Sequence, residues 1–367
     1  MNNFSSSSDL TKFFNDNIFE KIFIICGENS FKNSGAEKLL KEQLINKKIH
    51  FYFKKHPYPE FEELSKIISE VKEFSPELII AIGGGSVLDY AKIANALIKS
   101  ENLREEIINS SYKLENNFTK LVAIPTTAGS GAEVTSNAVI YVDKKKYSIE
   151  GSSIRPDFFF LIPELVISAS NKIKSSAGFD AIAQAIESLI SKKSNEKSIS
   201  FAEKSLNTSL KNFINYLEKP NLDNTFAMCL AANLAGEAIN ISKTTAPHAV
   251  SYPFTSIYNI SHGHAVSLTL NKFLKYNYNN LSSANCKFDL KQRFQTLFRL
   301  TNTEDISSLD KYLQTLKQKA NLEDDFIKLG IDIKNDYDKI ISGVNLMRLS
   351  NNPIDLDQDA LRNIILN

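Results

Sequence analysis

The stretch ELIIAIGGGS (77–86) decides the fold that we expect for this chain. Its apolar run predicts a buried β-strand, and the glycines at its end lead into LDYAKIANALI (88–98), whose apolar residues recur at helical spacing. Strand, turn and helix in this order form the repeating unit of a parallel, doubly wound sheet. Such sheets bind their ligands beyond the carboxyl ends of the strands.

The same alternation extends through the first half of the chain. The other expected strands and helices are, in order, KIFIICG (21–27), SFKNSGAEKLLKEQL (30–44), HFYF (50–53), FEELSKIISEVKEF (61–74) and KLVAIPTT (120–127). After about residue 165, apolar residues at three- and four-residue spacing dominate and the β-branched runs disappear. We therefore expect an α/β domain over residues 1–165 and an all-helical domain over residues 166–367. The serine-rich start (5–8) is expected to fray.

Composition excludes several classes of protein. A chain of 367 residues is long for one core, which also favours two domains. The net charge of +1 gives no reason to expect nucleic acid or an acidic membrane as a partner. The three cysteines lack any C-x-x-C spacing, which argues against a zinc ribbon or a disulfide framework. Without a signal pattern or an apolar run of about 18 residues, we expect a cytoplasmic protein that does not span a membrane.

The glycine-rich turn is a candidate phosphate site. Gly84, Gly85 and Ser86 follow the expected strand and open the expected helix. Glycines let the backbone approach a ligand closely, and a helix N-terminus offers N–H groups to a pyrophosphate. The spacing matches neither of the common glycine fingerprints, GxGxxG and GxxxxGK[ST]. The residues alone therefore leave two interpretations open, a nucleotide site and a plain tight turn.

A second segment, IPTTAGSGAEVT (124–135), also follows an expected strand and is rich in hydroxyl groups. Thr126, Thr127 and Ser130 are able to donate hydrogen bonds to phosphate or ribose oxygens. The alternative is that these hydroxyls cap a following helix, as Ser and Thr often do.

Histidines gather late in the chain. There are only five, and His248 and His262 stand close together, preceded by the helical segment GFDAIAQAIES (178–188) with its Asp180. One carboxylate and two imidazoles that converge on a point are typical of a divalent-metal site. Glu187, at the end of the same segment, is interpreted either as a support for that site or as a helix-surface ion pair.

Four motifs in order carry a resemblance to a known family. They are GGGSVLDYAK (83–92), PTTAGSGAE (125–133), GFDAIAQAIES (178–188) and HAVSYPFTSIYNISHG (248–263). Together they resemble the iron-containing (group III) alcohol dehydrogenases, from about residue 21 to the C-terminal RLSNNP (348–353).

The resemblance implies an α/β nucleotide-binding domain, a helical metal-binding and catalytic domain, and hydride exchange between NAD(P)H and a carbonyl or alcohol. It implies a divalent metal, Fe²⁺ or Zn²⁺, and a homodimer. The metal ligands that it implies are Asp180, Gln184, His248 and His262. The cofactor contacts that it implies are Gly84, Gly85, Ser86, Thr126, Thr127 and Ser130, with Asp89 and Lys146 as further candidates.

Two positions depart from the family's usual pattern. Gln184 stands where the family usually has a histidine, and Tyr252 stands where it usually has a further histidine near the nicotinamide. Four residues after Asp180, Gln184 shares its helix face, and its amide oxygen is able to coordinate a metal more weakly than imidazole. Catalytic roles are expected for His262 at the metal and for Tyr252, whose neutral phenol is able to donate a proton. The alternative for Tyr252 is a packed aromatic residue.

The dinucleotide preference is read from the turn after the first strand. Gly27 falls where NAD-preferring relatives often carry Asp, which favours NADPH, although Glu28 is adjacent and is able to favour NAD.

Within the family, the chain resembles the phosphonoacetaldehyde reductase-like branch, whose members reduce a small anionic aldehyde. Lys243, just before His248, is a candidate for holding a phosphonate or phosphate, or is a solvated lysine. Three alternatives remain open: a reductase of a small phosphorylated or dihydroxyacetone-like ketone, a dehydroquinate synthase-like lyase, and a non-catalytic nucleotide-binding protein whose metal site has decayed.

Overall fold

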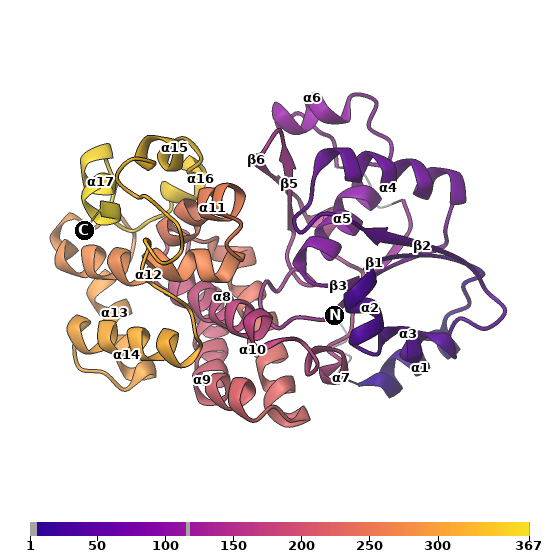
Figure 1. The fold of residues 1–367 in the computed structure, drawn as a ribbon, viewed down its shortest axis with the longest axis horizontal. Helices are drawn as coiled ribbons and strands as arrows, with labels where there is room; N and C mark the ends of the chain where they lie inside the picture. Colours follow the sequence, from indigo (N-terminus) through magenta and orange to yellow (C-terminus); the bar gives the residue numbers. More distant parts are fainter. Residues whose placement is uncertain (1–5, 115–117, 367) are drawn as a thin grey trace. The chain divides into compact units, whose positions relative to one another are not determined.

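The computed structural model of the chain describes residues 6–114 and 118–366. The chain forms two compact units, each drawn in Figure 1. The N-terminal unit comprises Met1–Ala169 and Asn221–Cys229, and the C-terminal unit comprises Ser170–Pro220 and Leu230–Asn367.

The N-terminal unit is built on a five-stranded parallel sheet. Its strands lie in the order β2 (Lys48–Lys54), β1 (Lys21–Gly27), β3 (Leu78–Gly83), β4 (Lys120–Pro125) and β7 (Phe158–Phe159). Every residue of β3 is buried, as expected of a central strand that is covered on both faces. The predicted fold class, a doubly wound α/β domain followed by a helical domain, is confirmed.

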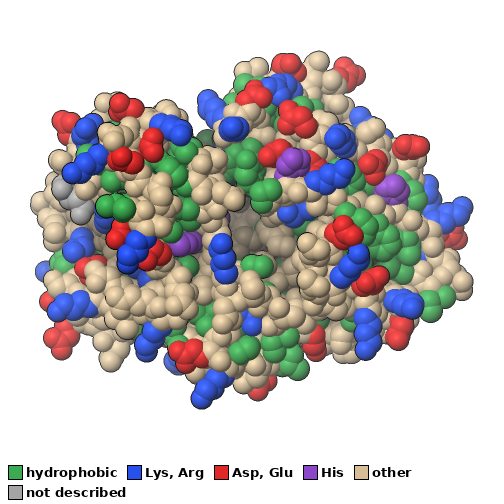
Figure 2. Space-filling view, in the orientation of Figure 1, with side chains coloured by type: hydrophobic (Ala, Val, Ile, Leu, Met, Phe, Trp, Pro, Cys, Tyr) green, Lys and Arg blue, Asp and Glu red, His purple; other side chains and the backbone are tan. Residues whose placement is uncertain are grey.

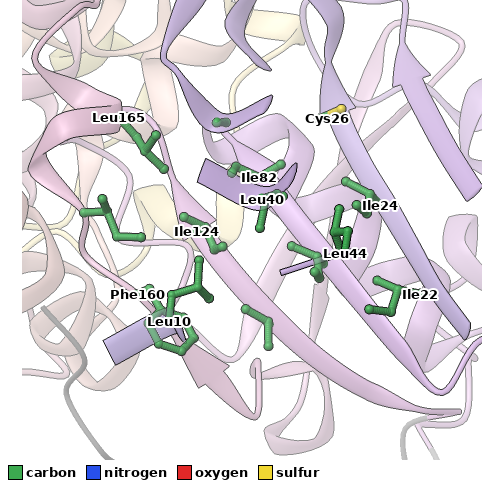
Figure 3. Close-up of a cluster of buried hydrophobic side chains, with 14 of the residues drawn as sticks. Leu10, Ile22, Ile24, Cys26, Leu40, Leu44, Ile82, Ile124, Phe160 and Leu165 are labelled. Atoms are coloured by element: carbon green, nitrogen blue, oxygen red, sulfur yellow. The ribbon is translucent and has the colours of Figure 1, made fainter. Parts of the chain in front are cut away.

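Helices cover both faces of this sheet. On one face, α1 (Ser7–Asp16), α2 (Glu28–Asn33) and α3 (Ala36–Lys41) share an apolar cluster with alternate residues of the strands, among them Leu10, Ile24, Leu40 and Ile82 (Figure 3). On the other face, α5 (Gly85–Ala96) packs on β3, and α4 (Phe61–Phe74) packs on α5. The unit also contains α6 (Leu103–Ile108) and α7 (Pro163–Val166).

Three local expectations were wrong. The helix expected over 30–44 is two helices, α2 and α3, because Gly35 takes a left-handed conformation with φ of +85° between them. The described part of the serine-rich start does not fray. Instead, Ser6 caps α1 by accepting a hydrogen bond from Asp9 N, and the Asp9 carboxylate accepts one from Ser6 N in return. No helix follows the hydroxyl-rich segment, because residues 126–136 form turns and bends that lead into a strand.

That strand belongs to a hairpin that the periodicity did not reveal. Strands β5 (Asn137–Val142) and β6 (Lys145–Glu150) pair antiparallel, with only Asp143 and Lys144 between them. Both turn residues have positive φ, 50° and 65°, the conformation of a tight hairpin turn. A strand pair joined by two residues without glycine gives little sequence signal.

The C-terminal unit is helical. It comprises α8 (Asn171–Ile190), α9 (Glu196–Glu218), most of α10 (Leu222–Ser242), α11 (Ala246–Tyr258), α12 (His262–Asn279), α13 (Leu290–Thr301), α14 (Ile306–Lys319), α15 (Tyr337–Ser342), α16 (Leu346–Leu349) and α17 (Gln358–Leu366). Helix α8 is buried along most of its length and packs against α9 and α12, while α11 packs against α12. Polar side chains on α8 therefore face other helices rather than solvent.

Gly263 fixes the approach of α12 to α8. A Cβ atom at this position would lie 2.0 Å from the carbonyl oxygen of Ser176 and 2.7 Å from Cβ of Asp180. Only glycine fits such a contact. The close approach brings the neighbouring His262 next to Asp180.

Two properties of the molecule bear on its possible partners: the apolarity of its helices and the distribution of charge on its surface. Among the described residues, no helix combines the length and apolarity that crossing a bilayer requires. On the face drawn in Figure 2, the described basic and acidic side chains are interspersed rather than gathered into one region of a single sign.

Candidate metal and nucleotide sites

Asp180, His248 and His262 converge within the C-terminal unit. They come from α8, α11 and the first residue of α12, and their ligand atoms all lie within 4.8 Å of one another. His248 Nε2 lies 3.3 Å from Asp180 Oδ1, and His262 Nε2 lies 4.0 Å from the same oxygen. Ligands that each stand about 2 Å from one divalent ion are spaced in this way.

Gln184 lies one helical turn after Asp180 and joins the cluster. Its Nε2 donates a hydrogen bond to Asp180 Oδ2 at 3.0 Å. Its Oε1 and His248 Nε2 are buried atoms without a hydrogen bond within the described part of the chain. The Gln184 amide oxygen and, once His248 has lost its proton, the imidazole Nε2 are atoms that a divalent cation accepts as ligands.

Glu187 orients His248. It is fully buried, and its carboxylate accepts hydrogen bonds from Thr245 N at 2.9 Å, from Thr245 Oγ1 at 2.8 Å and from His248 Nδ1. With Nδ1 held by Glu187, the opposite nitrogen of the ring faces Asp180. A carboxylate behind a ligating histidine is the usual support of a metal site. Glu187 is therefore not the surface ion pair that the sequence left open.

The same carboxylates set the charge of His248. Burial alone lowers the pKa of His248, but Glu187 and Asp180 outweigh burial and raise that pKa to about 9. Without a cation in the cluster, the imidazole is protonated at neutral pH.

Tyr252 lies beside His262. Its side chain is buried, and its ring stacks on that of His262 with centroids 5.9 Å apart and an interplanar angle of 22°. Burial raises the pKa of Tyr252, while the Arg348 guanidinium opposes burial through its charge and a side-chain hydrogen bond. The phenol is therefore neutral at pH 7 and able to donate a proton. Arg348 was not predicted from the sequence, because no motif marks a lone arginine as part of a site.

Two further polar side chains of this unit, His264 and the candidate Lys243, are not among the three residues of this cluster. His264 Nε2 is hydrogen-bonded to the Glu323 carbonyl oxygen at 2.8 Å. Lys243 is partly exposed and has a left-handed backbone, with φ of +59°, in the turn between α10 and α11.

In the N-terminal unit, the two segments expected to contact a nucleotide meet at the carboxyl ends of β3 and β4. Gly84 is the N-cap residue of α5, and no side chain caps this helix. A Cβ atom on Gly85 would lie 2.9 Å from Ser130 Oγ, and one on Gly84 would lie 3.5 Å from Thr127 Oγ1. Thr126 N donates to the Gly83 carbonyl oxygen at 2.9 Å and joins the two turns. Ser86, in the first turn of α5, completes the set.

Lys92 holds the hydroxyl-rich segment in place. It is almost fully buried, and its Nζ donates hydrogen bonds to Ala132 O at 2.9 Å, Thr135 Oγ1 at 2.9 Å and Asn137 O at 2.6 Å. Asp89 is buried one turn earlier, and burial raises the pKa of Asp89 to about 6, against the opposing charges of Lys92 and Lys146. Lys146 itself belongs to β6, and its charge acts on Asp89.

The turn after β1 carries the residues expected to select the dinucleotide. Gly27 precedes α2, and the exposed Glu28 pairs with Lys32 at 2.9 Å within that helix.

Comparisons with known proteins extend this picture. The family model "Iron-containing alcohol dehydrogenase" matches residues 4–163, and the C-terminal model of the same family matches residues 174–367. A phosphonoacetaldehyde reductase of Streptomyces viridochromogenes is 29% identical over 59% of this chain and 57% of its own length. A 4-hydroxybutyrate dehydrogenase of Clostridium kluyveri is 26% identical over 80% of this chain and 79% of its own length.

A solved structure also matches across both units. The sulfoacetaldehyde reductase of Bifidobacterium kashiwanohense in complex with NAD⁺ has a TM-score of 0.87 and 24% sequence identity, over 99% of this chain and 96% of its own. At 24% identity this similarity shows a shared fold. Because the two family models together account for nearly all of the sequence, the chain belongs to the iron-containing alcohol dehydrogenase family, as its motifs predict.

Proposed function

We propose that this chain is an NAD(P)H-dependent, metal-assisted reductase of a small anionic aldehyde such as phosphonoacetaldehyde. The observation that carries the proposal is the convergence of Asp180, His248 and His262, whose ligand atoms lie within 4.8 Å of one another. The proposed ligands of Fe²⁺ or Zn²⁺ are these three residues and Gln184.

The chemistry follows from the charge that hydride transfer creates. A hydride that reaches a carbonyl carbon leaves negative charge on the oxygen. A divalent cation in the cluster supplies Lewis-acid stabilisation of that charge. Tyr252 lies against His262 and has a neutral phenol. We therefore assign to Tyr252 the donation of the proton that converts the charged oxygen into the alcohol. Glu187 keeps the His248 ring in the orientation that leaves Nε2 facing Asp180.

For the cofactor, we propose that the pyrophosphate binds at the start of α5. Gly84, Gly85 and Ser86 supply backbone N–H groups at the start of α5, and Thr126, Thr127 and Ser130 supply hydroxyl donors beside it. Asp89 and Lys146 are proposed as outer contacts. The small residue Gly27 after β1 favours NADPH, because it leaves room for a 2′-phosphate, whereas Glu28 favours NAD.

For the substrate, the support comes from the chemistry named in the relatives. Phosphonoacetaldehyde, sulfoacetaldehyde and 4-hydroxybutyrate each carry an anionic group a short distance from the reacting carbon. Lys243, in the turn before α11, is one proposed contact of that group. A cytoplasmic location and a homodimer are further expectations, resting on the sequence and on the family resemblance.

The test is the oxidation of NADPH and NADH, followed at the nicotinamide absorbance band, by protein reconstituted with Fe²⁺ or Zn²⁺. The panel contains phosphonoacetaldehyde, sulfoacetaldehyde, succinic semialdehyde, butyraldehyde and dihydroxyacetone phosphate. We expect the anionic aldehydes to give the highest kcat/KM. Failure of every substrate with both cofactors and both metals contradicts a reductase.

A matched variant separates catalysis from a decayed site. His262→Ala removes one proposed ligand, so we expect loss of bound metal, measured by elemental analysis, together with at least about 100-fold lower kcat. Unchanged metal content and rate in this variant would contradict the proposed ligand set.

A further inference from the structure

Gln184 is a buried amide at the candidate metal site. Only 3% of the residue is exposed, and it lies on α8 one helical turn after Asp180. Its Nε2 donates a hydrogen bond to Asp180 Oδ2 at 3.0 Å, while its Oε1 has no hydrogen bond within the described part of the chain. A buried acceptor without a hydrogen bond costs free energy, because it has lost its contact with water. The amide oxygen therefore needs a partner that the described residues do not supply.

The same pairing of glutamine and aspartate occurs on another helix, where it needs no further partner. Gln314, on α14, follows Asp310 by four residues, and its Nε2 donates to Asp310 Oδ2 at 3.1 Å. Such a hydrogen bond is an ordinary stabilising contact on a helix surface. Gln314 is exposed, so water is able to reach its amide oxygen. Burial distinguishes Gln184 from Gln314, and the two glutamines form a matched pair for an experiment.

The Asp180 carboxylate divides its two oxygens between Gln184 and the histidines. Oδ2 accepts the hydrogen bond from Gln184, whereas Oδ1 lies 3.3 Å from His248 Nε2 and 4.0 Å from His262 Nε2. Because the oxygen and the nitrogen of an amide share one carbon atom, Gln184 Oε1 also lies near this carboxylate. The site therefore gathers oxygen donors from Asp180 and Gln184 and nitrogen donors from the two histidines.

We propose that Gln184 binds the cation of this site through Oε1, and that this oxygen lowers the preference of the site for Zn²⁺ over harder cations such as Mn²⁺. Imidazole nitrogen suits Zn²⁺, whereas carboxylate and carbonyl oxygens suit Mn²⁺. A site with two oxygen and two nitrogen donors therefore favours Zn²⁺ less strongly than a site with one oxygen and three nitrogens. This inference rests on the metal site of the function proposed above, and it names the residue that tunes which metal the site accepts.

The competing role for Gln184 is to position Asp180. In that role only Nε2 acts, through its hydrogen bond to Oδ2, and the amide oxygen does not touch the metal. Both roles predict weaker metal binding when the amide is removed. Only coordination by Oε1 predicts a short distance between that oxygen and the metal, so the first measurement is a direct one.

The first measurement locates the cation in the wild-type protein. Crystals loaded with Zn²⁺, and separately with Mn²⁺, are measured at wavelengths at which each metal scatters anomalously. We expect Gln184 Oε1 to lie about 2.0–2.2 Å from the metal, the usual distance of an oxygen ligand. An amide oxygen more than about 3 Å from the metal overturns coordination by Gln184.

The second measurement compares Gln184→His with the matched control Gln314→His. Affinities for Zn²⁺ and Mn²⁺ are determined by competition with a chelator, and the ratio of the two is taken for each protein. This ratio should rise at least about tenfold in Gln184→His, where a nitrogen replaces an oxygen, and stay within about twofold in Gln314→His. A smaller folded fraction cancels from the ratio, because both affinities are measured on the same preparation.

A third variant removes the donor altogether. Gln184→Leu offers neither an oxygen ligand nor a hydrogen bond to Asp180, so it should bind both metals at least about tenfold more weakly than wild type. Wild-type affinities in Gln184→Leu, or an unchanged ratio in Gln184→His, overturn the inference even in a protein that is an active reductase. A protein that shows the expected distance and ratio but reduces no aldehyde instead contradicts the proposed function and leaves the role of Gln184 standing.

Discussion

The Glu187 carboxylate joins α8 to the start of α11 through its hydrogen bonds with Thr245 and His248. Its place in the sequence hardly distinguishes it from an exposed glutamate, because Glu187 lies two turns after Asp180 at the end of a helix. Burial is what gives the residue its role. A carboxylate that orients a ligating imidazole typically changes metal affinity 10- to 100-fold.

We therefore expect Glu187→Gln to weaken Zn²⁺ binding by about 10- to 100-fold. The amide cannot replace both carboxylate oxygens that accept hydrogen bonds from Thr245 and His248. The measurement is a Zn²⁺ titration against a competing chelator, and Glu218→Gln, an exposed position on α9, is the control. Equal affinities in the two variants would show that Glu187 does not act on the metal.

The charge of His248 predicts how metal binding depends on pH. In the metal-free protein, the pKa of His248 is raised to about 9, so the ring is protonated at pH 7. A metal ligand must be deprotonated, so binding releases this proton. Affinity should rise as pH increases towards 9, by up to about tenfold per unit, and then level off. Chelator-competition titrations from pH 6.5 upwards check this, and a flat profile would contradict it.

The same raised pKa of His248 determines how the free energy of unfolding of the metal-free chain changes with pH. Stabilisation by the protonated ring is present in full below the ordinary histidine pKa of 6.5, which applies to the unfolded chain, and is lost as pH rises through about 9.

The site residues predicted from the sequence, Asp180, His248 and His262, are those whose types and motif context point to a metal. Arg348 was missed because a lone arginine reveals its position only when the chain folds.

At the scale of whole elements, the key contact is the close packing of α12 against α8, which Gly263 permits. We expect Gly263→Ala to lower stability by about 1–3 kcal/mol or more, because the added methyl group meets the Ser176 carbonyl oxygen at 2.0 Å and forces the two helices apart. It should also weaken metal binding, since His262 moves with α12. Thermal melting and metal content are the measurements. A variant that melts within about a degree of wild type and keeps its metal would refute the packing argument.

The elements that sequence predicted well are those with a strong period. The helix over 61–74 and the buried strand over 78–83 have clear apolar patterns, and both were predicted within a few residues. The prediction of one helix over 30–44 was wrong at Gly35, where φ is positive and the helix is interrupted. The apolar residues keep a helical period on both sides of this glycine, so the period alone does not reveal the break. The β5–β6 hairpin was missed because Asp143 and Lys144 form its turn without glycine.

At the scale of the whole molecule, the order of the elements was predictable, since alternating strands and helices followed by helices alone admit few folds. The way in which the chain passes back and forth between the two units was not predictable. The segment Asn221–Cys229 lies in the second half of the sequence yet groups with the N-terminal unit. Cys229 in this segment is buried, and burial together with the charges of Glu133 and Glu164 of the N-terminal unit raises the pKa of its thiol.

This return of the chain sets a limit on dissecting the protein. A gene fragment that stops after Ala169 deprives the first unit of the start of α10, including the buried Thr225 and Met228. We expect such a fragment to be recovered largely as aggregate, and a fragment carrying 221–229 on a flexible linker to give a higher soluble yield. Comparable yields would show that the segment is dispensable. The chain passes between the two units at three points, so exchanging one unit between relatives takes three junctions instead of one.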